Sequence, residues 1–125
     1  EIDVVSLMPM SVATDRNHAL DRIRPLVAFY CGFFPRYNRS IAEQGFPEEA
    51  QIIRDAWQRG DQATAIAKVP DRLIQMVSVT GTPAECRDRV DEYRAAGIKH
   101  PVIFPVSEGL TGKDHVFAAI DACAP

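Results

Sequence analysis

The residues best placed for chemistry in this sequence of 125 residues lie at a turn that opens a helix. Gly81 and Thr82 stand directly before Pro83, and Glu85 comes three residues after Thr82. Backbone N–H groups at a helix start can hold a phosphate or carboxylate, because the helix gives them no partner and its dipole favours negative charge. The same residues also suit a capping box, in which Thr82 and Glu85 each accept the other's backbone N–H. Gly81 and Thr82 are therefore candidates both for anion binding and for a purely structural cap.

Two further polar segments follow apolar stretches that suit strands. Ser11 comes shortly after the first apolar run, and Ser107 and Glu108 lie in a polar loop after the last one. Side chains that follow parallel strands gather at one edge of a sheet, where α/β enzymes bind their ligands. Ser11, Ser107 and Glu108 are therefore candidates for contact with a cofactor or substrate, although an ordinary polar loop is the favoured interpretation.

No arrangement of residues identifies a catalytic group or a metal site. There is no phosphate-binding Gly-rich loop, nucleophile elbow or His-x-x-x-His spacing, so the catalytic residues are unknown and no metal is expected. We expect the histidines not to converge and the cysteines to be free, buried thiols. These residues are His18, His100, His115, Cys31, Cys86 and Cys123.

Cys86 has two interpretations. It follows the capping turn closely, and a helix start can lower the pKa of a thiol. However, Cys86, Val90 and Tyr93 recur at helical spacing on one face. This pattern favours core packing over reactivity.

The elements that position these residues form a strand–helix–strand unit from Met76 to Pro105. A β-branched strand begins at Val77, the helix opens at Thr82 and Gly97 ends it. The second strand, Val102-Ile103-Phe104, is apolar throughout, as a strand covered on both faces should be. We expect a right-handed βαβ crossover.

The remaining chain predicts one more strand and several helices. The first strand should run from Ile2 to Met8 and stop at Pro9. A helix should follow from a cap at Thr14-Asp15 to about Cys31, either kinked or restarted at Pro25. Its apolar stripe is Leu20, Ile23, Val27 and Tyr30. From Arg36 to Val69 the pattern is helical throughout, and the closing helix from Asp114 carries Val116, Phe117, Ile120 and Cys123 as apolar positions.

The order of elements indicates an α/β fold with about three parallel strands. Such a sheet needs cover on both faces and would expose two edges. Repeated βα units with apolar strands suit a (β/α)8 TIM barrel, which takes about 250 residues. We therefore expect residues 1–125 to be a single partial domain, the C-terminal fragment of such a barrel. The alternative is a small complete α/β domain of flavodoxin-like kind.

Composition and charge exclude several partners. The chain is 46% hydrophobic and 25% charged with a net charge of −3, which is typical of an ordinary globular protein and disfavours nucleic acid. No apolar run has the roughly 20 residues of a membrane span, so no membrane partner is expected. Free cysteines suit a reducing compartment, so cytoplasm is the expected localisation. A fragment must also hide its barrel-facing side chains, so we expect a homodimer or a higher oligomer.

Ordered motifs along the chain resemble the luciferase-like monooxygenase family, and within it the branch that uses coenzyme F420 and includes methylenetetrahydromethanopterin reductase. The resemblance covers roughly residues 2–106 and is moderately specific as an ordered set. Its downstream motifs are residues 79–85, 93–97, 100–102 and 104–105, and its upstream motifs are residues 24–26, 29–30, 45–46, 48–50, 60–61 and 69–71.

This resemblance implies a TIM-barrel oxidoreductase that transfers a hydride or activates oxygen at a deazaflavin or flavin. The cofactor would be coenzyme F420, with FMN as the alternative, and the substrate a small molecule. The candidate cofactor-binding residues are Gly81, Thr82 and Ser11. Much of the family's cofactor pocket comes from strands that would precede Glu1, so we expect the isolated chain to bind no cofactor and to be inactive or nearly so. A self-associating, non-catalytic α/β module is the alternative function.

Overall fold

The chain divides into two compact units in a computed structural model that describes residues 3, 5–106 and 113–124. One unit comprises Glu1–Ile23 and Val77–Pro125, and the other comprises Arg24–Met76. Ser107 and Glu108, two of the polar candidates, lie outside the described residues. The single partial domain stays a prediction.

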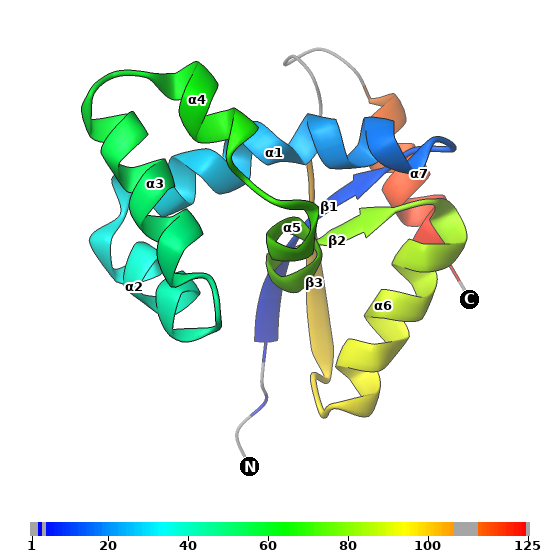
Figure 1. The fold of residues 1–125 in the computed structure, drawn as a ribbon. Coiled ribbons are helices and arrows are strands. Elements are labelled where there is room, and N and C mark those ends of the chain that lie inside the picture. The colour runs from blue at the N-terminus through cyan, green and yellow to red at the C-terminus, as the bar shows by residue number, and fades with distance from the viewer. Residues whose placement is uncertain (1–2, 4, 107–112, 125) are drawn as a thin grey trace. The chain divides into compact units, whose positions relative to one another are not determined.

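A three-stranded parallel sheet forms the centre of the first unit (Figure 1). Its strands are β1 (Val5–Val12), β2 (Val79–Gly81) and β3 (His100–Pro105), in the order β2-β1-β3. β3 pairs along β1 from Val5 to Met10, whereas β2 pairs with β1 from Met10 to Val12. The three parallel strands are confirmed. Their order differs from that of three consecutive barrel strands, because β1 lies between the other two.

Pro9 lies inside β1, so the prediction that it ends the strand was wrong. The Ala13 N–H donates to the Gly81 carbonyl in β2, and the Val106 N–H donates to the Met10 carbonyl in β1. The backbone groups of successive residues in a strand point to opposite neighbours, so those of Pro9, like those of Ala13, point toward β2. The register with β2 starts at Met10, so no ladder donor is needed at Pro9.

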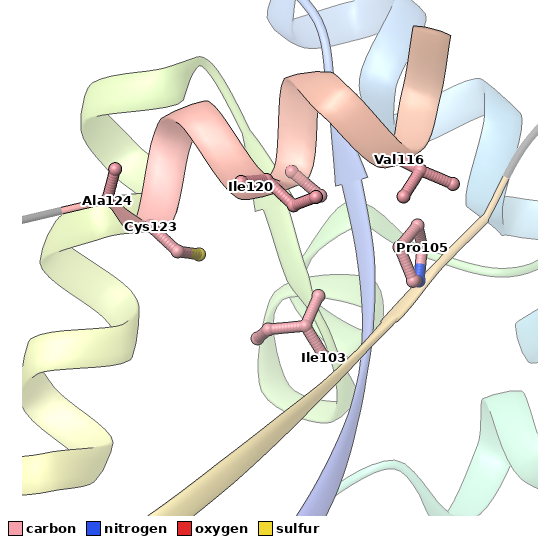
Figure 2. Close-up of a pocket in the computed structure, with 7 residues that line it drawn as sticks. Ile103, Pro105, Val116, Ile120, Cys123 and Ala124 are labelled. Atoms are coloured by element: carbon pink, nitrogen blue, oxygen red, sulfur yellow. The ribbon is translucent and has the colours of Figure 1, made fainter. Parts of the chain in front are cut away.

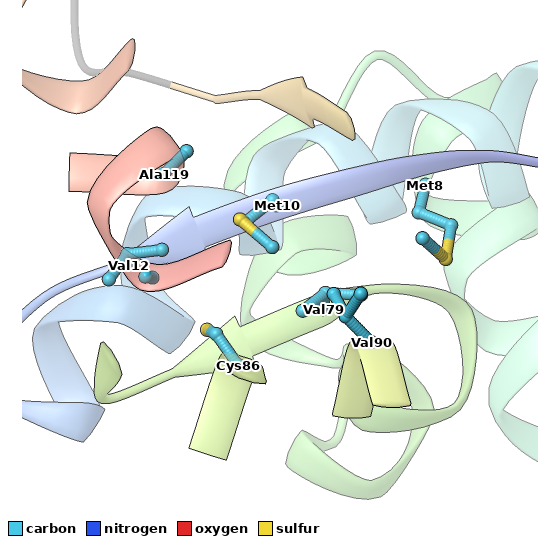
Figure 3. Close-up of a cluster of buried hydrophobic side chains, with 8 residues drawn as sticks. Met8, Met10, Val12, Val79, Cys86, Val90 and Ala119 are labelled. Atoms are coloured by element: carbon cyan, nitrogen blue, oxygen red, sulfur yellow. The ribbon is translucent and has the colours of Figure 1, made fainter. Parts of the chain in front are cut away.

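The core of this unit lies on one face of the sheet. Methionines and valines from β1 and β2 pack there against α6 (Pro83–Ala95) and α7 (Asp114–Cys123) (Figure 3). The buried cluster consists of Met8, Met10, Val12, Val79, Cys86, Val90, Ala119 and Ala122. Cys86 and Val90 are thus core residues as predicted, with Tyr93 packed against them.

The opposite face of the sheet is exposed along the paired segments of β1 and β3, but it is buried around Ser11 at the carboxyl end of β1. Val5 and Leu7 are 60% and 66% exposed on β1, and Val102 and Phe104 are 43% and 48% exposed on β3. The prediction that β3 is covered on both faces was therefore wrong for the described residues. An apolar strand sequence does not itself supply the elements that cover it.

The capping box at the start of α6 is confirmed. The Thr82 N–H donates to Glu85 Oε2 at 2.8 Å, and the Glu85 N–H donates to Thr82 Oγ1 at 3.4 Å. Arg16, at the first position of α1 (Arg16–Phe33), forms an ion pair with Glu85 at 2.9 Å. This ion pair joins the first turns of α1 and α6, the helices that follow β1 and β2.

The second unit is entirely helical in its described residues. It contains the later part of α1, then α2 (Pro35–Glu43), α3 (Pro47–Gln58), α4 (Gln62–Ala67) and most of α5 (Asp71–Val77). α1 is a single helix that continues through Pro25, so of the two predicted alternatives, a kink or a restart, the restart was wrong. Tyr30 is 40% exposed, so the prediction that it belongs to the apolar stripe of α1 was wrong.

Two close contacts hold the helices of this unit together. The Asn38 side-chain amide donates to the carbonyl of Cys31 in α1 at 2.9 Å and to that of Ala50 in α3 at 2.7 Å. A Cβ at Gly32 would lie 2.5 Å from Trp57 Cγ, so glycine lets α1 approach α3 closely. The close packing of α1 against Trp57 therefore requires glycine at position 32, although glycine has a low helix propensity.

We predict that Thr82→Ala lowers the free energy of unfolding by about 1 kcal/mol, because the cap acceptor is lost. Urea denaturation measures the change.

The hydrogen bond from the Thr82 N–H lowers the pKa of Glu85 from its ordinary 4.5, so the stabilisation that the Glu85 carboxylate gives the fold is complete above that pH. It is lost as the pH falls through the lowered pKa. Urea denaturation across this range should show a shallower pH dependence for Glu85→Gln. An unchanged pH dependence would contradict the capping role.

Gly32→Ala should destabilise the protein by about 1–3 kcal/mol, although alanine normally stabilises a helix relative to glycine. The added methyl group would overlap the Trp57 ring. Thermal or chemical unfolding measures the change. In a Trp57→Leu background the same substitution should become neutral or stabilising, and an equal loss in both backgrounds would exclude this contact as the cause.

Candidate functional site

The candidate site lies at the carboxyl ends of β1 and β2. Ser11 is the register partner of Thr80, and Val12 is the partner of Gly81. Because side chains alternate along a strand, Ser11 and Thr80 lie on the face opposite to the core residues Met10 and Val12. The pairing therefore brings two residues that are 69 positions apart in the sequence to adjacent places on one face.

Three hydroxyl groups gather at this edge. Ser78 Oγ and Thr80 Oγ1 lie 2.8 Å apart, and Ser11 is beside Thr80 in register. Ser11 is 1% exposed, and its Oγ has no hydrogen-bond partner among the described residues. A buried hydroxyl without a partner is costly, so such a group calls for an additional donor or acceptor. We call Ser11, Ser78 and Thr80 the hydroxyl cluster.

The turn at Gly81 and Thr82 is largely occupied by its own chain. The Thr82 N–H and Oγ1 both contact Glu85 Oε2, at 2.8 and 3.1 Å, and Pro83 has no N–H to offer. Gly81 has a φ of +151°, and a Cβ there would lie 2.5 Å from Glu85 Oε2. The Glu85 carboxylate thus leaves no room for a side chain at position 81 and completes the cap at Thr82. It also occupies the helix start, where an anion would bind.

Charge at this turn is nearly balanced. The hydrogen bond from the Thr82 backbone is the largest of the effects that lower the pKa of Glu85, with the Arg16 charge a smaller one. The Arg16–Glu85 pair is about half exposed, so its contribution to stability is small. The turn therefore suits a neutral polar group better than a free phosphate.

Metal ligands and a reactive thiol are two other kinds of catalytic group to consider among the described residues. They contain no group of three or more His, Cys, Asp or Glu side chains able to hold a metal ion. Burial raises the pKa of Cys86 to about 12, with smaller contributions from Cys123 and Glu85, which favours the neutral thiol over the reactive thiolate. The earlier possibility of a lowered pKa at Cys86 was wrong.

The sequence analysis identified some of the residues in the candidate site and missed others. Ser11, Gly81 and Thr82 all lie at the carboxyl ends of β1 and β2, as expected. Ser78 was not among the candidates. The signal for it was the spacing of Ser78 and Thr80, which places two hydroxyls on one face of a strand around the buried Val79. The cofactor-binding role of Ser11, Gly81 and Thr82 stays a prediction.

None of the helices within the described ranges is both long enough and apolar enough to cross a bilayer.

Comparison with known proteins gives two similar relatives. The chain is 30% identical over 105 residues to a 5,10-methylenetetrahydromethanopterin reductase of Archaeoglobus fulgidus, covering 80% of this chain and 31% of the relative. It is also 30% identical over 104 residues to a protein of the same name from Methanopyrus kandleri, covering 82% and 29%. The chain therefore spans about a third of the length of these relatives.

A solved structure agrees with this similarity at the level of fold. The coenzyme F420-dependent tetrahydromethanopterin reductase of Methanopyrus kandleri superposes with a TM-score of 0.76 at 24% identity. The match covers 96% of this chain and 33% of that one. It supports the partial TIM barrel predicted from the sequence.

A family model described as luciferase-like monooxygenase matches residues 1–100. The motifs that resemble this family, the partial barrel and the match over most of the sequence agree, and the chain belongs to the luciferase-like monooxygenase family.

Proposed function

We propose that this chain is part of a coenzyme F420-dependent oxidoreductase that transfers a hydride to or from a small-molecule substrate. The observation that carries this proposal is the 30% identity to two 5,10-methylenetetrahydromethanopterin reductases over more than 100 residues. Their names support, as the proposed substrate class, tetrahydropterins that carry a one-carbon group. Since the chain spans about a third of these relatives, the activity is proposed for an assembled barrel.

The hydroxyl cluster is the part of this chain that best fits contact with the cofactor or substrate. Ser11 offers one donor and two acceptor lone pairs, and its Oγ is buried without a partner among the described residues. The ribityl chain or the pyrimidine edge of a deazaflavin presents hydroxyl, carbonyl and N–H groups that match a neutral hydroxyl. Gly81 and Thr82 would shape the turn beside it through Glu85.

Coenzyme F420, when bound, supplies the hydride chemistry, and the residues of this chain position and shield it. Ser11 and Thr80 would orient a polar group at the carboxyl ends of β1 and β2. Leu7 and Val102, which are register partners on the same face but nearer the amino ends, would keep water from the ring. Since the chain spans about a third of the relatives that it matches, we propose that the isolated chain is inactive.

A chimeric enzyme tests the proposal directly. The matching third of the Methanopyrus kandleri reductase is replaced by this chain, and oxidation of reduced F420 is followed by absorbance. We expect F420-dependent turnover, with Ser11→Ala weakening cofactor or substrate binding about tenfold, as the loss of one buried hydrogen bond implies.

Ser6→Ala is the matched control, because Ser6 lies on the same strand but on the face that carries Met8 and Met10. It should leave binding unchanged. A folded chimera that turns over with FMN but not F420 would contradict the choice of cofactor. A folded chimera without either activity would contradict the proposed function.

A further inference from the structure

Ser78 is a buried serine at the point where a helix changes into a strand. α5 ends at Val77, β2 begins at Val79, and Ser78 between them is 2% exposed. Packing alone would favour an apolar residue there, because a buried hydroxyl must replace the hydrogen bonds that it makes in water. Ser78 Oγ lies 2.8 Å from Thr80 Oγ1, at hydrogen-bond distance. Thr80 thus accounts for at least part of the burial of this hydroxyl.

The hydrogen bond with Ser78 fixes where the Thr80 hydroxyl lies. One rotation about χ1 puts the methyl group of a threonine where its hydroxyl was, because both are attached to the same carbon. Thr80 is partly exposed, and its register partner on the neighbouring strand is Ser11. Ser11 is 1% exposed, and its Oγ has no hydrogen-bond partner among the described residues. Ser78 therefore holds the Thr80 hydroxyl beside a second hydroxyl that still needs a partner.

We propose that Ser78 is a positioning residue, which orients Thr80 so that Thr80 and Ser11 together bind the N–H and C=O edge of a fused pyrimidinone ring. This inference rests on the proposed function, because the deazaflavin of coenzyme F420 and a pterin both carry such an edge. Neighbouring strands lie about 4.8 Å apart. The nitrogen and oxygen atoms of the edge are about 2.3 Å apart, as amide bond lengths require. Two hydroxyls on adjacent strands can therefore each reach one of these atoms.

A neutral edge suits these hydroxyls better than an anion does. Each hydroxyl can donate one hydrogen bond and accept two, so the pair can meet one ring donor and one ring acceptor. If Thr80 donates to Ser78, its lone pairs can accept the ring N–H; if Ser78 donates, the Thr80 proton can reach the ring C=O. The Glu85 carboxylate already occupies the adjacent helix start, where it would repel a phosphate.

The apolar cavity between α7 and β3 is a poorer site for such a ring (Figure 2). Its volume of about 540 Å³ lies within the range of small-molecule sites. However, nearly all of its lining is apolar, so it offers few polar groups to orient the ring edge. Ile103 and Pro105 line it from β3, and Val116, Ile120 and Cys123 line it from α7. The hydroxyl cluster supplies the polar groups that this cavity lacks.

Double-mutant kinetics in the chimeric reductase test the proposal. Thr80→Val keeps the shape of the side chain and removes its hydroxyl, so the KM for the bound ring should rise about tenfold with little change in kcat. Ser78→Ala should raise the same KM about threefold, because Thr80 is then free to adopt other rotamers. In the Thr80→Val background, Ser78→Ala should have no further effect on KM, since Ser78 acts through Thr80. Thr80→Ser keeps the hydroxyl and should leave KM close to the wild-type value.

Separate titrations of the two reactants identify which ring lies at this edge. The KM for reduced F420 is measured at saturating one-carbon tetrahydropterin, and the KM for the tetrahydropterin at saturating reduced F420. A rise in the KM for F420 alone assigns the edge to the deazaflavin, and a rise in the KM for the tetrahydropterin alone assigns it to the pterin. Either result supports the proposal. Equal rises in both KM values would indicate a general distortion of the site and would overturn it.

Ser6→Ala is again the matched control, because Ser6 lies on the core face of β1, and it should leave both KM values unchanged. Urea denaturation measures the stability of each variant separately. If Ser78→Ala lowers stability without changing KM, or raises KM equally in both backgrounds, Ser78 does not position Thr80 and the inference is wrong. A folded wild-type chimera without F420-dependent turnover would instead contradict the proposed function, and this inference with it.

Discussion

The pairing of β1 on both of its sides is the constraint on which the first unit depends. β3 pairs along the amino-terminal part of the strand and β2 pairs at its carboxyl end. Once the strand is fixed in this way, alternation assigns each side chain to a face. Met8 and Met10 must then enter the core beneath α6 and α7, while Leu7 and Ser11 must lie on the opposite face. A shift of one residue would exchange the two sets and destroy both the core and the site.

The same strand pairing explains why apolar and polar side chains occupy different parts of the face opposite the core. Toward the amino ends of the strands, this face presents the register partners Leu7 and Val102. At the carboxyl ends it presents Ser11 and Thr80, the hydroxyl of Ser11 being buried and without a partner among the described residues. In a barrel this face points inward and the carboxyl ends form the mouth, where active sites lie. A few strand pairs thus position the polar side chains of the candidate site and the apolar side chains beneath them.

Local chemistry made some features predictable from the sequence and tertiary context hid others. The capping box at Thr82 and Glu85 follows from residues three positions apart, so it could be read directly. The continuation of β1 through Pro9 could not, because it depends on where the register with β2 begins, 70 residues later. Similarly, periodicity identifies the apolar positions of α7 but cannot say that Ala119 is buried and Phe117 exposed. For the site, Ser11 was accessible to sequence reasoning, whereas its proximity to Ser78 and Thr80 depends on strand pairing.

Hydrogen exchange of the backbone amides in β3 tests the central role of β1 most directly. The Val106 N–H donates to the Met10 carbonyl at 2.8 Å, which fixes the direction of every other N–H in the strand. The account predicts that the amides of Val102 and Phe104, which point toward β1, exchange slowly, while the amide of Ile103 exchanges much faster. Protection of Ile103 together with rapid exchange at Val102 and Phe104 would mean that β3 does not pair with β1 in this register, and the assignment of faces would be wrong.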